Sequence, residues 1–386
     1  MVVARDVDQL LIRAVDDGAA PGVVALAAGD GGVLYQGAWG VRELGAAAPM
    51  TLDTVMWIAS MTKAVTSVAA MQLVEQGRIG LDEPLGDRIP GLASLQVLEG
   101  FDVDGVPRLR AARRSVTLRR LLTHTAGFAY HIWNAETRRY LDYADIPTVG
   151  ERTLGTPVVF EPGERFEYGV SIDWAGRIVE HLCGQSLEDY FRQHILDPLG
   201  MNDTGFLLRP EQRSRLAGLH ERQPDGSLRV IPVEKPQQPE FFEGGGGLYS
   251  TGTDYLRFLR MLLGAGQIDG VRVLWPETVA EMGQNQIGDL SVGRITTVMP
   301  ARSNDFEFFP GMDKKWGLAC MITMEDAPTG RSAGSLAWGG LANTYYWIDP
   351  TRRVTGLIMT QILPFADPCV LDLFERFERG IYPSDA

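Results

Sequence analysis

Ser60 and Lys63 form a Ser-x-x-Lys sequence where a β-rich segment gives way to a run of helix-forming residues. Three positions apart on a helix, the two side chains share one face, with about 5–6 Å between their Cβ atoms, so their polar ends can hydrogen-bond. The unpaired N–H groups and the dipole of a helix N-terminus favour negative charge, such as that of an alkoxide. A desolvated lysine holds its proton less tightly and can accept one. The pair could therefore supply a nucleophile and its base.

The surroundings of Lys63 favour this chemistry over a solvated surface charge. A Ser-x-x-Lys sequence occurs by chance in many chains of this size, where it marks no more than a helix start. Here it occurs once, and Lys63 lies in a segment from Met56 to Leu73 that is otherwise mostly apolar, small or hydroxyl-bearing. A lysine in such a helix needs a partner.

Two further segments carry residues that could take part. Tyr168 follows the Pro162-Gly163 turn and precedes an apolar-periodic helix, so we expect it on a loop at a helix start. Trp338 is followed by two glycines in a strand, which leave backbone N–H groups open to a ligand. Taken singly, each residue is more often structural.

Together, the three motifs and their order resemble the class C branch of the serine β-lactamase and penicillin-binding superfamily. Nearly the whole chain takes part in the resemblance, through segments such as MWIASMTKAVTSVAAMQLVEQGRIGLDEPL, LRRLLTHTAGF, FEPGERFEYGVS and WGGLANTYYWIDP. The resemblance implies that Ser60 is the acylated nucleophile, that Lys63 takes its proton and that Tyr168 carries protons to the leaving group. It leaves open whether Lys63 or Tyr168 is the primary base. It also implies an oxyanion hole formed by the backbone N–H groups of Ser60 and Leu341.

Two positions depart from the β-lactamase pattern. Trp338 stands where those enzymes carry a lysine or histidine that helps to hold the substrate carboxylate, and Val170 stands where they carry an asparagine. Losing both polar contacts favours neutral, partly apolar acyl groups. In this respect the chain resembles the family VIII carboxylesterases, which hydrolyse short-acyl esters. We expect substrate contacts from a set of four residues: Trp338, Gly339, Gly340 and Tyr130.

The function predicted is that of a serine carboxylesterase that hydrolyses small-molecule, short-acyl esters through a Ser60 acyl-enzyme, with no cofactor and no metal. The same scaffold leaves open a β-lactamase, a D-amino-acid peptidase, a small-amide hydrolase or an acyltransferase. A non-catalytic binding protein that retains the fold is a third class of hypothesis.

Rival motifs carry less weight. Gly330-Arg331-Ser332-Ala333-Gly334 fits G-x-S-x-G, but a nucleophile elbow needs a helix after it and a histidine later in the chain, and neither follows. We expect Ser332 in a turn. His124 and His131 lack a third clustered ligand and favour packing over metal binding. The run from Gly244 to Gly247 lacks a P-loop lysine and indicates a close backbone approach or a flexible loop.

Composition indicates the class of protein and the partners that it can bind. The 386 residues are 45% hydrophobic and 22% charged, within the ordinary globular range. A formal charge of -13 disfavours binding to nucleic acid or to an anionic membrane surface.

The three cysteines lie far apart, so a disulfide framework is not expected. Without an apolar signal-like segment, the chain is predicted to be cytoplasmic. Its oligomeric state stays open.

The fold predicted is α/β (α+β), with an antiparallel sheet flanked by helices. Strands are expected in PGVVALAAGD and GVLYQGAWGV near the N-terminus and in SLAWGG, NTYYWIDP and VTGLIMTQIL near the C-terminus, followed by a helix from about 367. Further helices are expected from Ser60 to Gly77 and near 117–123, 171–183, 187–196 and 255–262. Residues 1–80 and 295–386 should form the sheet domain and residues 81–294 a helix-rich lobe, with the active site at their junction.

Overall fold

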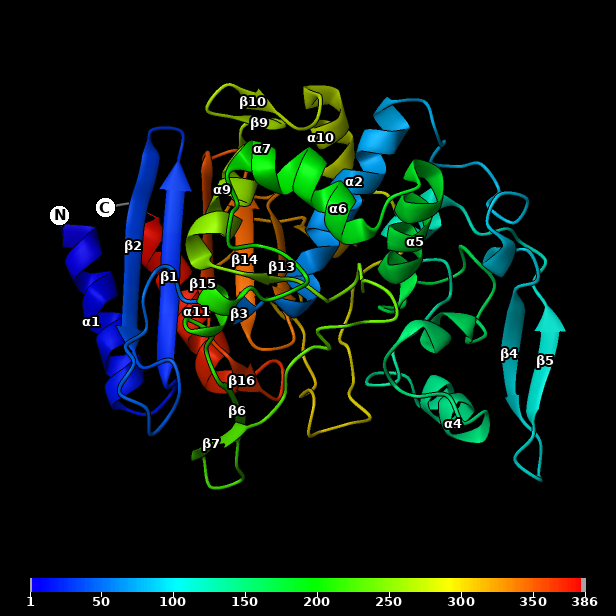
Figure 1. The fold of residues 1–386 in the computed structure, drawn as a ribbon, viewed down its shortest axis with the longest axis horizontal. Coiled ribbons are helices and arrows are strands. Elements are labelled where there is room, and N and C mark those ends of the chain that lie inside the picture. Colours follow the sequence, from blue (N-terminus) through cyan, green and yellow to red (C-terminus); the bar gives the residue numbers. More distant parts are fainter. Residues whose placement is uncertain (1, 383–386) are drawn as a thin grey trace.

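The computed structural model describes residues 2–382. Its central layer is a seven-stranded sheet in the order β11-β12-β13-β14-β15-β1-β2, in which every neighbouring pair is antiparallel (Figure 1). The strands are β1 (Gly22–Gly29), β2 (Gly32–Gly40), β11 (Lys314–Trp316), β12 (Met321–Thr323), β13 (Leu336–Gly340), β14 (Thr344–Asp349) and β15 (Val354–Met359). Because β1 pairs with β15, the two ends of the chain close one sheet, as the sequence predicted.

Helices cover both faces of this sheet because side chains alternate along its strands. On β14, Tyr345 and Trp347 point to one face, where they pack on Phe374 and Phe377 of the C-terminal helix. Tyr346, between them, packs on Tyr255 on the opposite face. The helices concerned are α11 (Pro368–Ile381), with α1 (Val2–Asp16) beside it, and on the other face α9 (Gly252–Leu263). The helix expected from about residue 367 is therefore present.

The remaining helices form a lobe beside the sheet, and α2 links the two layers (Figure 1). Every residue of α2 from Thr62 to Leu73 is buried, and the helix packs against α5 and α6. The glycine expected to end it, Gly77, has φ +66, the left-handed conformation of a helix stop. The lobe helices are α2 (Thr62–Glu75), α3 (Leu118–Leu122), α4 (Ala135–Tyr143), α5 (Ser171–Cys183), α6 (Leu187–Phe191), α7 (Asp197–Leu199), α8 (Pro210–Arg213) and α10 (Pro276–Met282).

Short strand pairs join these layers or project from them. The β4-β5 hairpin lies at the end of the molecule opposite the chain termini (Figure 1). The short strands are β3 (Met56–Trp57), β4 (Gln96–Phe101), β5 (Pro107–Ala111), β6 (Leu219–Arg222), β7 (Leu228–Ile231), β8 (Tyr249–Ser250), β9 (Gln267–Ile268), β10 (Val271–Arg272) and β16 (Ile362–Leu363). Because β3 pairs with β8, the chain just before Ser60 is tied to the segment that follows the glycine run.

The layers do not divide at the residues predicted. Helix α9 falls within 81–294, yet it packs on β1, β14 and β15 of the sheet. A Cβ atom on Gly252 would lie 2.6 Å from Leu26 and 2.8 Å from Val24, so this glycine lets the helix approach the sheet closely. The segment 252–263 therefore packs as part of the sheet layer, not of the helix-rich lobe.

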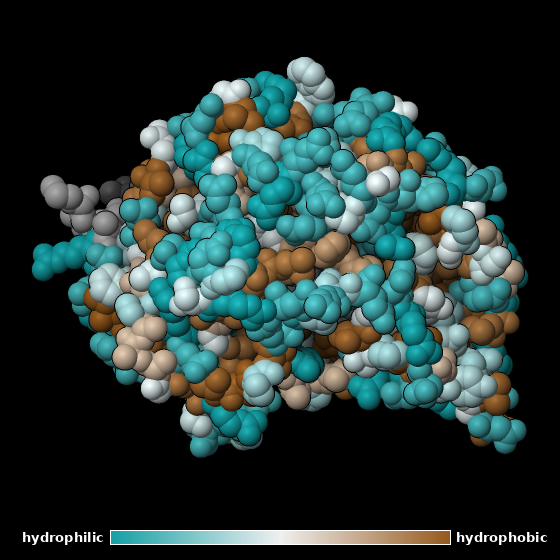
Figure 2. Space-filling view, in the orientation of Figure 1, coloured by the Kyte–Doolittle hydropathy of each residue, from teal (hydrophilic) through white to brown (hydrophobic). Residues whose placement is uncertain are grey.

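The face of the molecule in Figure 2 is mostly hydrophilic, with hydrophobic residues showing in smaller patches between. Single exposed apolar side chains such as Val103, at the tip of the β4-β5 hairpin, are ordinary for a folded protein. Within residues 2–382, no helix combines the length and the apolar character that crossing a membrane requires.

Candidate active site

Ser60 lies in a single 3-10 turn, Ala59–Met61, that leads directly into α2. Its backbone N–H belongs to the first turn of the helical segment, where N–H groups have no intrahelical partner. The preceding residue, Ala59, has φ 43, a left-handed conformation that is unfavourable for a residue with a Cβ atom. Such strain persists only where the surrounding packing holds it, and it is common beside reacting groups.

Lys63 is 1% exposed and fully used as a hydrogen-bond donor. Its Nζ donates to Ser60 Oγ at 3.1 Å, to the hydroxyl of Tyr130 at 3.1 Å and to the carbonyl oxygen of Gly245. Three acceptors match the three N–H bonds of an ammonium group. The structure thus places Ser60 and Lys63 in contact, in the geometry that the Ser-x-x-Lys spacing indicated.

Tyr168 lies beside the lysine, but its hydroxyl is bonded elsewhere. Lys63 Nζ is 4.9 Å from the centroid of the Tyr168 ring, within the range of a cation–π contact. The Tyr168 hydroxyl accepts a hydrogen bond of 3.0 Å from Nε1 of Trp338, and among the described residues it has none with Ser60 or Lys63. Its ring is 5% exposed and packs against His124 at 4.7 Å between centroids.

Tyr130, predicted only as a substrate contact, also has a hydrogen bond with Lys63. Its hydroxyl accepts from Lys63, and its ring lies 5.1 Å from Lys63 Nζ and 5.4 Å from the Tyr168 ring. Burial, reinforced by the charge of Asp173, holds the pKa of Tyr130 well above its usual value of 10. The phenol therefore keeps its proton at neutral pH.

The glycine run folds over the start of α2. The carbonyl oxygen of Gly244 accepts from Thr66 Oγ1 at 2.6 Å, and the N–H of Gly245 donates to Asp173 Oδ1 at 2.8 Å. A Cβ atom on Gly245 would lie 2.6 Å from Asp173 Oδ2 and 2.9 Å from the hydroxyl of Tyr130. Of the two possibilities that the sequence left for this run, the structure shows the close backbone approach.

Asp173 is a site residue that the sequence reasoning missed. It lies in the first turn of α5 and lines the same pocket as Ser60. Burial, followed by the charge of Glu243, raises the pKa of Asp173 from 3.8 to about 6. Its position in SIDWAGRIVE gave no local sign of a role, because an acidic residue in a first helical turn is common.

Among the described residues, neither of the two predicted packing histidines has a hydrogen bond with Ser60 or Lys63; His124 Nδ1 accepts from the N–H of Gly169. His124 is wholly buried, and burial together with the Lys63 charge lowers its pKa well below 6.5. Burial also lowers the pKa of His131, on the pocket wall, to about 4. Both rings are therefore neutral at pH 7. Within residues 2–382, no cluster of three His, Cys, Asp or Glu side chains could hold a metal ion.

The end of β13 approaches the turn that carries Ser60. A Cβ atom on Gly340 would lie 2.2 Å from the carbonyl oxygen of Ile58 and 2.4 Å from Thr344 Oγ1, so no larger residue fits without displacement. Leu341, the next residue, lines the pocket together with Ser60. Of the substrate contacts expected, Tyr130 lines the pocket, whereas Trp338, Gly339 and Gly340 are buried behind it.

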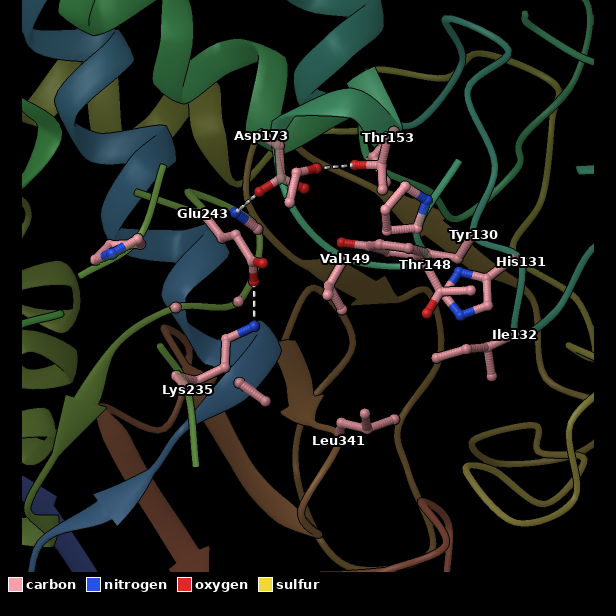
Figure 3. A pocket seen from close by; sticks show the side chains of 18 of the residues that line it. Tyr130, His131, Ile132, Thr148, Val149, Thr153, Asp173, Lys235, Glu243 and Leu341 are labelled. Atoms are coloured by element: carbon pink, nitrogen blue, oxygen red, sulfur yellow. Dashed lines mark hydrogen bonds and ion pairs between the residues drawn. The ribbon is translucent and has the colours of Figure 1, made fainter. Parts of the chain in front are cut away.

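Ser60 opens into a pocket of about 770 Å³. Its outer wall comes from two segments: 147–153, which runs from a loop into the 3-10 turn Glu151–Gly155, and the irregular segment 233–243. Figure 3 shows the ion pair of Lys235 with Glu243 across the pocket from Tyr130 and His131. The apolar lining includes Trp57, Ile132, Trp133, Leu141, Pro147, Val149, Phe206, Val233, Pro239, Phe241, Phe242, Met299 and Leu341.

Ser332 of the rival G-x-S-x-G motif has no hydrogen bond with Ser60, Lys63 or Tyr130 among the described residues. It belongs to the loop between β12 and β13, and its N–H donates to Asp349 Oδ2 at 2.9 Å. A strand, β13, follows the motif, and Ser332 is not among the residues that line the pocket. The structure agrees with the turn predicted for it.

Comparison with known proteins gives the family. The sequence model of the Beta-lactamase family matches residues 7–377. The chain belongs to the beta-lactamase family.

Relatives within this family include transferases and an esterase. Monacolin J acid methylbutanoyltransferase of Aspergillus terreus is 34% identical, covering 96% of this chain and 93% of its own. Lovastatin esterase of Penicillium rubens is 33% identical, covering 97% of both. The unliganded structure of simvastatin synthase (LovD) from Aspergillus terreus, as its selenomethionyl derivative, is 32% identical with a TM-score of 0.84, covering 98% and 97% of the two chains.

These findings confirm the predicted fold and the resemblance on which it was based. The protein is a serine hydrolase of the β-lactamase fold. Among its relatives, one is named for acyl transfer and one for ester cleavage.

Proposed function

We propose that the protein is a serine carboxylesterase that cleaves neutral esters through an acyl-enzyme on Ser60 and passes the acyl group to water or to an alcohol. The observation that carries the proposal is the hydrogen bond between Lys63 Nζ and Ser60 Oγ, at a serine that lines a large pocket. A nucleophile in contact with its base is the arrangement that covalent acyl transfer requires.

The chemistry follows from the contacts of Lys63. In the reactive form the amine has one proton fewer, keeps its N–H bonds to Gly245 and Tyr130, and turns its lone pair to the hydroxyl of Ser60. Ser60 Oγ attacks the ester carbonyl as its proton passes to Lys63. The backbone N–H groups of Ser60 and Leu341 would hold the oxyanion. The alcohol leaves with a proton, and water or a second alcohol reverses these steps on the acyl-enzyme.

The pocket favours an ester whose alcohol part is large and not anionic. A short acyl group occupies only a small part of about 770 Å³, which is the size of a drug-sized ligand site. Four acidic side chains line the pocket: Asp173, Glu234, Glu240 and Glu243. Three cationic side chains, Lys235, Arg152 and Arg302, also line it, and Lys235 is paired with Glu243.

Whether water or an alcohol takes the acyl group is the open part of this proposal, and the names of the relatives support both outcomes. The name of the Aspergillus terreus relative specifies transfer of a methylbutanoyl group, and that of the Penicillium rubens relative specifies ester cleavage. Both reactions pass through the same acyl-enzyme and differ in the nucleophile that releases it. Exclusion of water by a bound alcohol would decide between them.

The test uses p-nitrophenyl butyrate with the wild-type protein, Ser60→Ala and the matched control Ser332→Ala. Intact mass should show a butyryl adduct on wild type and on Ser332→Ala, and none on Ser60→Ala. Adding an alcohol should raise the rate of p-nitrophenol release if transfer competes with hydrolysis. Full turnover by Ser60→Ala would refute the proposal, and cephalosporin turnover at a rate equal to that of the ester would favour the amide-directed alternative.

A further inference from the structure

The two tyrosines beside Lys63 differ in what their hydroxyl groups can reach. The Tyr168 hydroxyl accepts from Trp338, and Tyr168 is not among the residues that line the pocket. The Tyr130 hydroxyl accepts from Lys63, and Tyr130 points into the pocket (Figure 3). Ser60 lines the same pocket. A substrate ester in the pocket therefore meets the hydroxyl of Tyr130.

The hydrogen atom of that hydroxyl has no acceptor among the described residues. Every phenol can donate one hydrogen bond as well as accept. Within residues 2–382, the Tyr130 oxygen takes its one hydrogen bond from Lys63, and no acceptor takes a bond from its O–H. A donor left free at the wall of a pocket is available to an oxygen atom of the ligand.

We propose that Tyr130 is a second tyrosine of the reaction, which donates a hydrogen bond and then its proton to the alcohol oxygen of the ester. This inference rests on the proposed function, because it assigns the group that protonates the leaving alcohol. Tyr130 is suited to donate and not to act as the base. Burial and the neighbouring charge of Asp173 both disfavour the phenolate.

The proton balance closes through Lys63. During acylation the bond between Ser60 Oγ and the acyl carbon forms, and the bond between that carbon and the alkoxy oxygen breaks. The proton of Ser60 passes to the amine of Lys63, one N–H proton of Lys63 passes to the Tyr130 oxygen, and the original Tyr130 proton passes to the alkoxide. Lys63 and Tyr130 end as they began. In deacylation the same transfers run in reverse, from the incoming water or alcohol to Ser60.

The test compares two butyrate esters whose leaving groups differ in their need for a proton. Ethoxide is strongly basic and needs protonation, whereas p-nitrophenolate leaves without it. Removing a general acid costs about 10²–10⁴-fold. Tyr130→Phe should therefore lower kcat/KM for ethyl butyrate by about 100-fold or more and for p-nitrophenyl butyrate by less than about tenfold. The ratio kcat/KM isolates binding and acylation, because the rate of deacylation of the shared butyryl-enzyme enters kcat and KM alike and cancels from their ratio.

Three further variants complete the experiment. Tyr190→Phe removes a hydroxyl from a buried tyrosine in α6 that does not line the pocket, and it should leave both esters unchanged. Tyr168→Phe reports on the tyrosine that the family resemblance assigns. Tyr130→Leu replaces Tyr130→Phe if the latter does not fold.

Each outcome either supports or overturns the role proposed for Tyr130. An equal loss on both esters with Tyr130→Phe, no loss on either, or a leaving-group-dependent loss with Tyr168→Phe alone would overturn the inference. A leaving-group-dependent loss with Tyr130→Phe supports it, whether or not Tyr168→Phe behaves in the same way. If the proposed function itself fails, wild type forms no butyryl adduct on Ser60 and turns over neither ester, which is seen before any tyrosine variant is compared.

Discussion

The inner end of the pocket and its outer rim are built in different ways. The inner end takes its groups from the start of α2, the end of β13 and the glycine run, and Lys63 there is buried with three hydrogen-bond acceptors. The rim consists of segments 147–153 and 233–243, where Val149 is 61% exposed. The groups of the inner end, on helix and loop alike, are held by packing and hydrogen bonds, whereas the rim segments are more exposed and so are better suited to selecting a ligand.

This difference predicts two kinds of mutational effect. Changes at the inner end should alter kcat for every ester, because they disturb the reacting groups themselves. Changes at the rim should alter KM for some esters and not for others.

The largest effect is expected from Lys63→Ala. Loss of the group that contacts Ser60 Oγ should lower kcat for p-nitrophenyl butyrate by about 10³-fold or more, because the serine then lacks its base. A chromogenic ester assay measures this. Lys315→Ala, whose Nζ donates to the carbonyl oxygen of Leu290 outside the pocket, is the control and should keep its activity. A Lys63→Ala protein with near-normal kcat would contradict the role given to the inner end.

Gly340→Ala should have the next largest effect. The new methyl group would lie 2.2 Å from the carbonyl oxygen of Ile58, so β13 must move away from the turn that carries Ser60. A displacement of about 1 Å at a reacting centre costs about 100-fold in rate. We expect that loss in kcat and a lower Tm by calorimetry. Gly293→Ala, where a Cβ atom meets nothing within 4 Å, should change neither; if both variants behave alike, the close approach of β13 is unimportant.

Asp173→Asn tests whether the buried charge of Asp173 lowers the stability of the folded protein. Because the pKa of Asp173 is about 6 in the folded protein and 3.8 as its usual value, the folded state binds this proton more tightly than the unfolded chain. Its contribution to stability is thus most favourable below about pH 4 and falls as the pH rises to about 6. A difference of about 2 pKa units corresponds to about 3 kcal/mol.

Asp173→Asn should therefore raise the free energy of unfolding at pH 7.5 by about 2–3 kcal/mol and have little effect at pH 4, as measured by urea unfolding. Asp254→Asn, at a carboxyl group of α9 whose pKa burial also raises to about 6, should behave in the same way without any contact with the pocket. A loss of stability at pH 7.5 on replacing Asp173 would show that its charge stabilises the fold.

The smallest effect is expected from Val149→Ala at the rim. Removing part of an exposed apolar wall should raise KM for an ester with a large alcohol group by about threefold to tenfold, and leave kcat and the KM for methyl butyrate unchanged. Val103→Ala, at a fully exposed hairpin tip outside the pocket, is the control. A fall in kcat for methyl butyrate would mean that the rim and the inner end are not independent.

Local patterns in the sequence were enough for the sheet, most helices and the contact between Ser60 and Lys63. Alternation along β14 and the apolar period of α2 are visible within one segment, and three residues of helix set the serine beside the lysine. The hydrogen bond from Lys63 to Tyr130 joins residues 67 positions apart, and no local pattern reports how their segments fold together.

The same limit applies to Tyr168 and Trp338. Each was singled out by its own motif, but the hydrogen bond between them depends on packing across 170 positions. A signal for Tyr130 did exist, because it lies two residues after LRRLLTHTAGF, one of the segments that resemble the family. The sequence held no signal for the contact between Lys63 and the carbonyl oxygen of Gly245, because a run of glycines does not determine the direction of its peptide groups.

The pairing of β1 with β15 has a consequence for how the protein is made. Val24 lies opposite Met359, so a ribosome must produce almost the whole chain before the central sheet can close. The strand that leads to Leu341 also emerges late, so nascent chains hold Ser60 long before they hold the backbone N–H group expected to stabilise its oxyanion. Such long-range pairing slows folding and leaves strand edges exposed during synthesis. We expect expression of this protein to depend on chaperones more than its size alone would suggest.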